Sequence, residues 1–155
     1  MTFRLGIISD THGLLRPEAE RILAGVDHII HGGDIGSPDI IAALCRIAPV
    51  TAIRGNVDTH AWAERYGETE LVQLAGRSIF VLHDRKALAI DPAARGIDVV
   101  ISGHSHVPKI ETVGSVLYLN PGSAGRRRFK LPITLAILDI EPDILRPVIH
   151  DLGDG

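Results

Sequence analysis

The chain has 155 residues, a formal net charge of −3 and 45% hydrophobic residues, which are ordinary values for a globular protein and predict one domain over residues 1–155. The aromatic content of 4% and the slight negative charge argue against a nucleic-acid polymer as the partner, because such binders carry basic surfaces and stacking aromatic rings. No apolar run approaches the ~20 residues that cross a bilayer, so no membrane association is expected. Cys45 is the only cysteine, which excludes an intramolecular disulfide and favours a cytoplasmic location.

The first third of the chain alternates strands and helices. Strands are predicted over residues 5–8, 28–31 and 50–53, where short apolar runs end at polar residues or glycine. Helices are predicted over residues 16–25 and 37–46. The first has a proline near its start and a glycine at its end, and Ser37 is the expected cap of the second. This order of elements predicts a parallel sheet.

The remainder of the chain is predicted to consist mainly of hairpins. The paired segments are residues 70–74 with 78–82, 109–113 with 116–119, and 133–140 with 144–149. A short helix over residues 91–96 and a strand over residues 98–102 are expected between the first two hairpins. Two sheets that share one core, with helices on the outside, are therefore the predicted architecture.

Five short polar clusters directly follow predicted strands: Asp10-Thr11-His12, Gly33-Asp34, Gly55-Asn56, His83 and Gly103-His104-Ser105-His106. Because an α/β sheet gathers groups that follow its strands along one edge, we expect the clusters to meet. Together they offer two carboxylates, four imidazoles and one amide oxygen. This set is richer than a structural zinc site needs and suits two divalent ions that share a carboxylate. The spacing leaves open which histidine serves which ion.

Two such ions suit the hydrolysis of a phosphoester. At a separation of ~3.5–4 Å they lower the pKa of bound water to ~7 and polarise the phosphoryl oxygens. Asp34 is the candidate for the shared carboxylate, because Gly33 and Gly36 beside it allow the backbone to come close. The sequence therefore predicts a two-metal hydrolase.

Each cluster on its own has a plainer interpretation. A single aspartate at a strand end is more often a turn or helix cap, and an isolated histidine is usually a surface or core residue. The coincidence of five clusters is what favours the metal site. Among the other residues, His31 is expected to pack or to support the ligands, Cys45 to be buried and inert, and Trp62 to pack or to form a subunit contact.

The ordered motifs Asp-x-His, Gly-Asp, Gly-Asn, His and Gly-His-x-His resemble those of the calcineurin-like metallophosphoesterases. The short chain and the segment Asn120-Pro121-Gly122-Ser123 are similar to their small YfcE-like phosphodiesterase branch. The resemblance extends from about residue 4 to residue 149. It implies an α/β fold, a four-layer αββα sandwich of two mixed β-sheets flanked by helices, with a dimetal site at the strand ends.

The resemblance also implies a ligand set and a mechanism. The first ion would be held by Asp10, His12, Asp34 and His106, and the second by Asp34, Asn56, His83 and His104. The expected ion is Mn²⁺, with Fe, Zn²⁺ or Ni²⁺ as alternatives. A hydroxide bridging the two ions would attack phosphorus. Asp34 would act as the bridge, while Asn56 and His104 help to hold the phosphoryl oxygens.

Two positions depart from the pattern of the family. Many members have a histidine directly after Gly-Asn that is thought to protonate the leaving group, whereas this chain has Val57. Substrates with good leaving groups should then be favoured. Relatives commonly show His-Gly-His where this chain has His83 followed by Asp84 and Arg85. Arg85 is expected either to form an exposed salt bridge or to contact a phosphate.

Several further residues are assigned supporting roles. Asn120, Gly122 and Ser123 are expected to orient metal ligands through backbone groups. Arg127 belongs to the basic cluster at residues 126–130, which is either a solvated loop or a rim that attracts an anionic substrate.

The expected function is a metal-dependent phosphodiesterase that acts on a small phosphoester. A phosphomonoesterase and a protein with one functional metal site are alternatives. A catalytically weak or inactive metal-binding interaction scaffold is the alternative from a different class, since a retromer subunit with this fold works in that way. A homodimer, with Trp62 in the contact, is left open.

Overall fold

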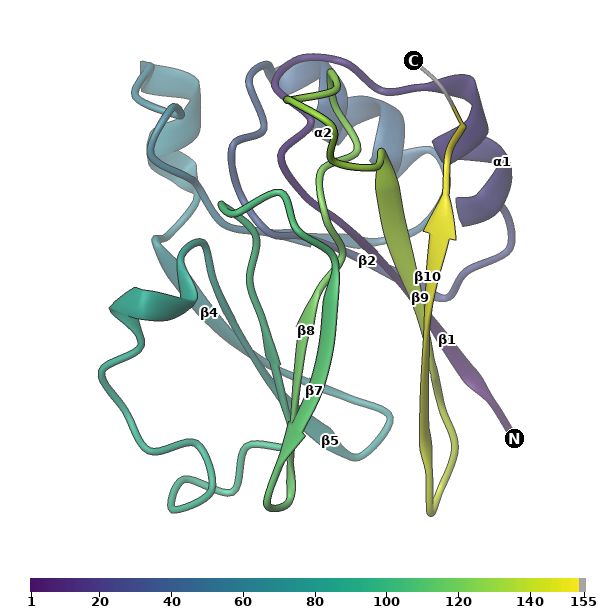
Figure 1. Cartoon of the computed structure of the whole chain (residues 1–155), viewed down its shortest axis with the longest axis vertical. Coiled ribbons are helices and arrows are strands. Elements are labelled where there is room, and N and C mark those ends of the chain that lie inside the picture. Colours follow the sequence, from purple (N-terminus) through teal and green to yellow (C-terminus); the bar gives the residue numbers. More distant parts are fainter. Residues whose placement is uncertain (154–155) are drawn as a thin grey trace.

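The structure is a computed structural model that describes residues 1–153, and it consists of two five-stranded mixed β-sheets (Figure 1). The first sheet comprises β1 (Phe3–Ile8), β2 (His28–His31), β3 (Val50–Ala52), β9 (Thr134–Ile140) and β10 (Leu145–Asp151) in the order β10-β9-β1-β2-β3. The second comprises β4 (Thr69–Leu74), β5 (Arg77–Leu82), β6 (Val99–Ile101), β7 (Lys109–Val113) and β8 (Val116–Asn120) in the order β4-β5-β6-β8-β7.

The first sheet confirms the strand–helix prediction. β1, β2 and β3 pair in parallel, and the β9–β10 hairpin joins β1 in antiparallel pairing. The helices α1 (Pro17–Leu23) and α2 (Pro38–Cys45) cover its outer face, and the Ser37 hydroxyl accepts a hydrogen bond from the Asp39 amide as the predicted cap. Trp62 and Tyr66, in and beside the 3₁₀ helix η1 (Ala61–Arg65), are partly buried against this layer, which supports the packing interpretation.

A hydrophobic core between the sheets fixes their relative position. Buried side chains from the strands of both sheets form it, including Leu5, Ile30, Ile79, Ile101 and Leu138. Alternate residues of these strands point to this core, which explains why the apolar runs in the sequence are short and dense. The sandwich holds the carboxyl ends of β1, β2, β3, β5 and β6 at one end of the molecule.

The outer face of the second sheet departs in detail from the expected layers. The segment 83–97 covers it with apolar residues such as Leu88 and Ile90, and its only helical element is the 3₁₀ helix η2 (Arg85–Ala87). The helix predicted over residues 91–96 is wrong: the chain makes turns there, and Gly96 ends them with a φ of +69°. Six residues are too few for a helix without strong packing of one face.

Cys45 also differs from its prediction, because its side chain is exposed. It follows the buried Leu44 at the end of α2, and neighbouring helix positions point about 100° apart. Among the described residues, no helix has both the length and the apolar character to cross a membrane.

Candidate metal centre

The five clusters predicted from the sequence meet at one end of the sandwich. Ligand atoms of Asp10, His12 and His106 lie within 4.8 Å of one another, and so do those of Asp10, Asp34 and His83. Asp10 and His12 follow β1, Asp34 follows β2, His83 follows β5 and His106 follows β6. Five residues from four strand ends therefore converge on a volume that suits divalent ions.

The two carboxylates lie between the imidazoles. Asp34 Oδ2 is 3.1 Å from His83 Nε2 and 3.7 Å from His12 Nε2, so one oxygen faces a histidine of each predicted ligand set. Asp10 Oδ1 is 3.4 Å from His106 Nε2 and 3.8 Å from His83 Nε2. The position of Asp34 between the two sets is the geometry expected of a shared ligand.

Unsatisfied polar atoms show that the residues present fit metal ions. In the part of the chain that the structure describes, the buried atoms Asp10 Oδ1 and His12 Nε2 have no hydrogen-bond partner. Buried polar atoms in folded proteins are nearly always paired, and an exception calls for an explanation. Carboxylate oxygens and imidazole nitrogens are ligands of Mn²⁺, Fe, Zn²⁺ and Ni²⁺, and a bound ion satisfies both atoms.

The backbone at the site adopts an unusual conformation. Asp10, His12, Asp34, His104 and His106 all have left-handed φ angles, of 54°, 47°, 56°, 68° and 64°. For residues other than glycine this conformation costs about 1–2 kcal/mol each, and it persists where the surroundings impose it, often at functional sites. The sharp turns bring the side chains of consecutive motif residues toward the same centre.

Glycines next to the ligands allow neighbouring segments to come close. A Cβ atom on Gly55 would lie 2.2 Å from Asp34 Oδ1, and one on Gly103 would lie 2.5 Å from Asp10 Oδ2. The Gly-Asn and Gly-His motifs thus need glycine because the backbone of one strand end touches the carboxylate of another.

Asp34 and His83 form an ion pair, with 3.1 Å between Asp34 Oδ2 and His83 Nε2. Burial alone would raise the pKa of Asp34, but the close contact with His83 and the hydrogen bond from the Val57 amide outweigh it and lower this pKa to about 2. Burial alone would lower the pKa of His83, but its contact with Asp34 and its hydrogen bond to the Gly32 carbonyl raise it to about 9. A metal ion must therefore displace a proton from His83 when it binds.

His104 and Asn56 lie at the open side of the centre. Both are exposed and line, together with His83, a cavity of about 540 Å³. The rings of His104 and His83 are 5.1 Å apart between centroids, and the His104 amide donates to Asp10 Oδ2 at 3.1 Å. The structure thus brings both residues to the site, on its solvent side, while the other five candidate ligands form its interior.

The segment after β8 is hydrogen-bonded to the backbone at and beside two of the candidate ligand motifs. The Ser123 hydroxyl donates to the Asp10 carbonyl at 3.1 Å, and Asn120 Nδ2 donates to the Gly103 carbonyl at 2.9 Å. Asn120 Oδ1 accepts from the Gly122 amide. These bonds fix the backbone on both sides of the candidate ligands.

Asp58 is a supporting residue that the sequence reasoning missed. Its side chain is 3% exposed and accepts hydrogen bonds from the amides of Ile35, Gly36 and Gly55 at 2.9–3.0 Å. It thereby ties the segment after Asp34 to the segment before Asn56. The sequence does contain one indication of this role. Asp58 stands two residues after Asn56 in a predicted loop, and a short polar side chain in a turn readily accepts hydrogen bonds from backbone amides.

The two arginines assigned to substrate differ in their surroundings. Arg85 forms a salt bridge of 2.6 Å with Glu111 and stacks 4.0 Å from the ring of Tyr118, in agreement with the salt-bridge alternative. Arg127 is exposed in the basic segment that follows Gly125, whose backbone lies against that of Asp10 and Thr11. Its role at the rim remains a prediction.

His31 is buried beneath the ligands and connects two of their turns, as expected of a supporting residue. Its Nδ1 accepts from the Gly33 amide at 3.1 Å, so Nε2 carries the proton and donates to the Thr11 hydroxyl at 2.9 Å. That hydroxyl donates in turn to the Ile35 carbonyl. A charged His31 would break the bond from Gly33, and burial lowers its pKa to about 4.

We therefore expect the metal-free protein to lose stability in mild acid. Between pH 6.5 and 4 the unfolded chain binds a proton at His31 that the folded chain does not, so the free energy of unfolding falls by about 3 kcal/mol as the pH falls through this window. Urea unfolding at several pH values measures it. His31→Phe should flatten the slope, whereas the exposed-residue control His60→Phe should keep it, and an unchanged slope in His31→Phe would contradict the assignment.

Comparison with known proteins identifies the family. The calcineurin-like phosphoesterase superfamily domain matches residues 3–143. A "probable metallophosphoesterase" of Methanothermobacter thermautotrophicus is 34% identical over 145 residues, covering 86% of this chain and 84% of that protein. An archaeal phosphodiesterase of known structure is 28% identical with a TM-score of 0.78, covering 95% of this chain and 99% of that one. Vacuolar protein sorting 29 of Cryptosporidium parvum shares the fold, with a TM-score of 0.84 at 19% identity over 99% of this chain and 93% of that one. The chain belongs to the calcineurin-like phosphoesterases, a family of metal-dependent hydrolases.

Proposed function

We propose that this phosphoesterase is a dinuclear phosphodiesterase that acts on a small phosphoester. The observation that carries the proposal is the convergence of Asp10, His12, Asp34, His83 and His106 in two groups of ligand atoms, each within 4.8 Å. Both groups contain Asp10, and Asp34 Oδ2 lies 3.1 Å from His83 Nε2 and 3.7 Å from His12 Nε2, so Asp34 also faces a histidine of each proposed ligand set, as a carboxylate shared by two ions would. The similarity to an archaeal phosphodiesterase over 95% of the chain supports the diester preference.

The proposed ligand sets are those that the resemblance to the family implies. Asp10, His12, Asp34 and His106 would hold the first ion, and Asp34, Asn56, His83 and His104 the second. The exposed positions of Asn56 and His104 support a second ion that is more open to solvent and to substrate. Mn²⁺ suits this mixture of oxygen and nitrogen donors, with Fe, Zn²⁺ and Ni²⁺ as alternatives, since supply in the cell also decides occupancy.

The chain's own residues bind and orient the phosphoester. When bound, the ions supply a nucleophile at neutral pH and draw charge from the phosphoryl oxygens. The Asn56 amide and the His104 imidazole can donate hydrogen bonds to these oxygens from the open side. Asp34, bonded to the Val57 amide at 3.0 Å, is held in place between the two sets of ligands.

The proposal is tested by an assay on metal-stripped protein that is refilled with Mn²⁺. We expect hydrolysis of bis-p-nitrophenyl phosphate that depends on the metal and exceeds that of p-nitrophenyl phosphate. A higher rate on the monoester would instead identify a phosphomonoesterase. No turnover of either compound by folded, metal-loaded protein would favour an interaction scaffold, a role that the fold alone permits.

Val57 gives a second prediction, about the leaving group. Its side chain is 43% exposed directly after Asn56, at the position where many relatives have a histidine, so a larger polar side chain fits there. Val57→His should raise the rate of hydrolysis of an alkyl diester such as dimethyl phosphate by roughly 10²-fold, because a general acid helps a poor leaving group most. Aryl diester turnover should change little. Val57→Gln, which transfers no proton, serves as the control; an equal gain from both variants would contradict a general-acid role.

We further propose that residues 1–155 act as one domain in the cytoplasm. The shared core between the two sheets supports the first statement, and the presence of a single cysteine in the sequence supports the second.

A further inference from the structure

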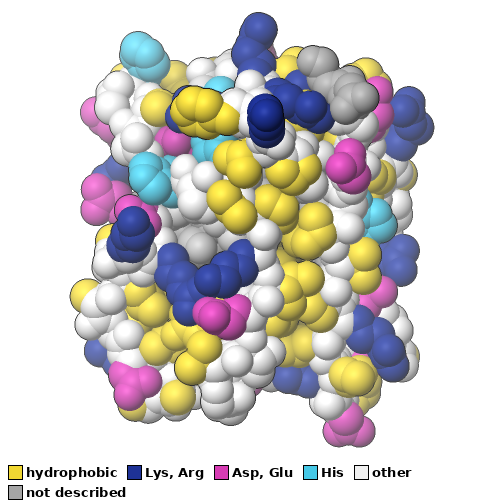
Figure 2. All heavy atoms as spheres, viewed as in Figure 1, with side chains coloured by type: hydrophobic (Ala, Val, Ile, Leu, Met, Phe, Trp, Pro, Cys, Tyr) yellow, Lys and Arg dark blue, Asp and Glu magenta, His cyan; other side chains and the backbone are white. Residues whose placement is uncertain are grey.

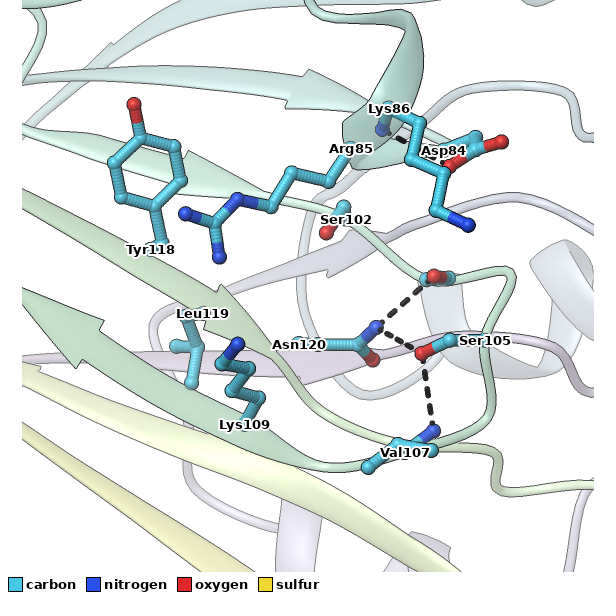
Figure 3. A pocket seen from close by; sticks show the side chains of 11 residues that line it. Asp84, Arg85, Lys86, Ser102, Ser105, Val107, Lys109, Tyr118, Leu119 and Asn120 are labelled. Atoms are coloured by element: carbon cyan, nitrogen blue, oxygen red, sulfur yellow. Dashed lines mark hydrogen bonds between the residues drawn. The ribbon is translucent and has the colours of Figure 1, made fainter.

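A second cavity lies next to the metal centre, on the outer face of the second sheet. It has a volume of about 460 Å³, within the range of small-molecule sites. Figure 3 shows it between the η2 segment, the loop after β6 and strands β7 and β8. Asp84 lines this cavity and also the one that contains His83 and His104, and Gly103 lines it while its backbone touches Asp10. The two hollows are therefore neighbours that share a wall.

Basic side chains outnumber acidic ones among the charged residues that line this cavity. Arg85, Lys86 and Lys109 bring three positive charges, against the single carboxylate of Asp84 among the lining residues. Figure 2 shows the basic side chains around a hollow in the surface. Glu111, outside the lining, pairs with Arg85 at 2.6 Å through Nη2 and with Lys109 at 3.9 Å. Because the contact between Lys109 and Glu111 is long, the Lys109 ammonium group can still bind an anion in the cavity.

Two serine hydroxyls add uncharged donors. Ser102 is 5% exposed and lines the cavity, so its hydroxyl is a polar group that a ligand there can reach. Ser105 Oγ accepts from Asn120 Nδ2 at 3.1 Å and from the Val107 amide at 3.2 Å, so its own proton is left to donate.

Asp84 places one negative charge on the wall of the cavity, and both of its oxygens face other groups. Oδ1 accepts from the Lys86 amide at 3.0 Å, and Oδ2 lies 3.8 Å from His104 Nε2. Leu119, Val107 and Tyr118 form an apolar part of the lining. A ligand that fits both parts is a small organic molecule with one anionic group.

We propose that this cavity binds the phosphate or carboxylate group of a small organic anion, held by Lys109, Ser102 and Ser105 beside the metal centre. The anion can be a second acidic group of the substrate or a separate effector. The first source rests on the proposed phosphodiesterase function, whereas the binding itself does not.

Binding is tested on the metal-free full-length protein, because bound metals would themselves attract phosphate. Inorganic phosphate is titrated while the backbone amide resonances of Ser102, Ser105 and Lys109 are followed. We expect a saturable shift, and a Kd raised by about tenfold in Lys109→Gln and in Ser102→Ala, as is typical when one charge-assisted bond is lost. Arg21→Gln on α1 is the matched control, since Arg21 is also in an exposed ion pair with a glutamate. No saturable shift, or the same Kd in all variants, overturns the proposal.

The source of the anion is then distinguished on the Mn²⁺-loaded enzyme with a matched pair of diesters, p-nitrophenyl butyl phosphate and p-nitrophenyl 3-carboxypropyl phosphate. If the site serves the substrate, the carboxylated diester has a KM about tenfold lower, and Lys109→Gln removes the difference. Equal KM values together with saturable phosphate binding assign the site to a separate effector. An enzyme inactive on both diesters would count against the proposed function and leave the binding result standing.

Discussion

Asp34→Asn should lower the Mn²⁺-dependent hydrolysis of bis-p-nitrophenyl phosphate by about 10³-fold or more, equivalent to about 4 kcal/mol in the barrier. The substitution removes the charge that lies 3.1 Å from His83 Nε2 and 3.7 Å from His12 Nε2, where it would offset the repulsion between two cations. Asparagine tolerates the φ of 56° at this position, and its Oδ1 still accepts from the Val57 amide. The fold should therefore survive while metal content and turnover fall.

The control for this variant is Asp39→Asn, which removes one carboxylate from the exposed first turn of α2. It should keep wild-type turnover and metal content. Full activity of Asp34→Asn at saturating Mn²⁺ would show that this carboxylate is not a shared ligand. A melting temperature close to that of wild type distinguishes a loss of metal from a loss of structure.

Asp58→Asn should destabilise the protein by about 2–4 kcal/mol, the cost of leaving one or two buried amides without an acceptor. Asp58 accepts from Ile35, Gly36 and Gly55, and an amide nitrogen in place of one oxygen would face a donor. Because these bonds join the turns of Asp34 and Asn56, turnover should also fall, by roughly 10–100-fold, as for other residues that hold metal ligands. Thermal unfolding and assays of the metal-loaded variant measure the two effects.

Asp27→Asn is the matched control, because exposed Asp27 accepts a single amide hydrogen bond, from Arg4, at the opposite end of β1. Its effect should stay below about 1 kcal/mol, with turnover unchanged. If Asp58→Asn behaves like Asp27→Asn in both measurements, Asp58 does not organise the site.

The strand-end motifs could be predicted because two local signals coincide in the sequence. Mainly apolar strands of three to six residues form β1, β2, β3, β5 and β6, and a glycine, aspartate or histidine of a motif follows each strand within three residues. The parallel pairing of β1, β2 and β3 then brings Asp10 and Asp34 together. Family resemblance supplied the division of ligands between two ions, which spacing alone left open.

The features that the sequence did not reveal depend on contacts between distant segments. Asp58 accepts hydrogen bonds from the amides of Ile35 and Gly36, and although its place in a turn suggests that it accepts amides, it does not reveal that these distant ones are its partners. Exposure of Cys45 depends on which side of α2 faces the sheet. The second cavity combines Arg85, Ser102 and Lys109, which the order β5-β6-β8-β7 gathers on one face. The periodicity of apolar residues identifies helices and strands, whereas contacts between distant segments depend on how the strands are ordered in the sheets.

If two ions act together at one site, a metal titration of the protein should show both of them. Metal-stripped protein is mixed with increasing Mn²⁺, and both bound metal per chain and initial rate on bis-p-nitrophenyl phosphate are measured. We expect binding to saturate at two ions per chain and the rate to rise mainly with the second ion. Full activity at one ion per chain, with no further gain, would contradict the dinuclear mechanism.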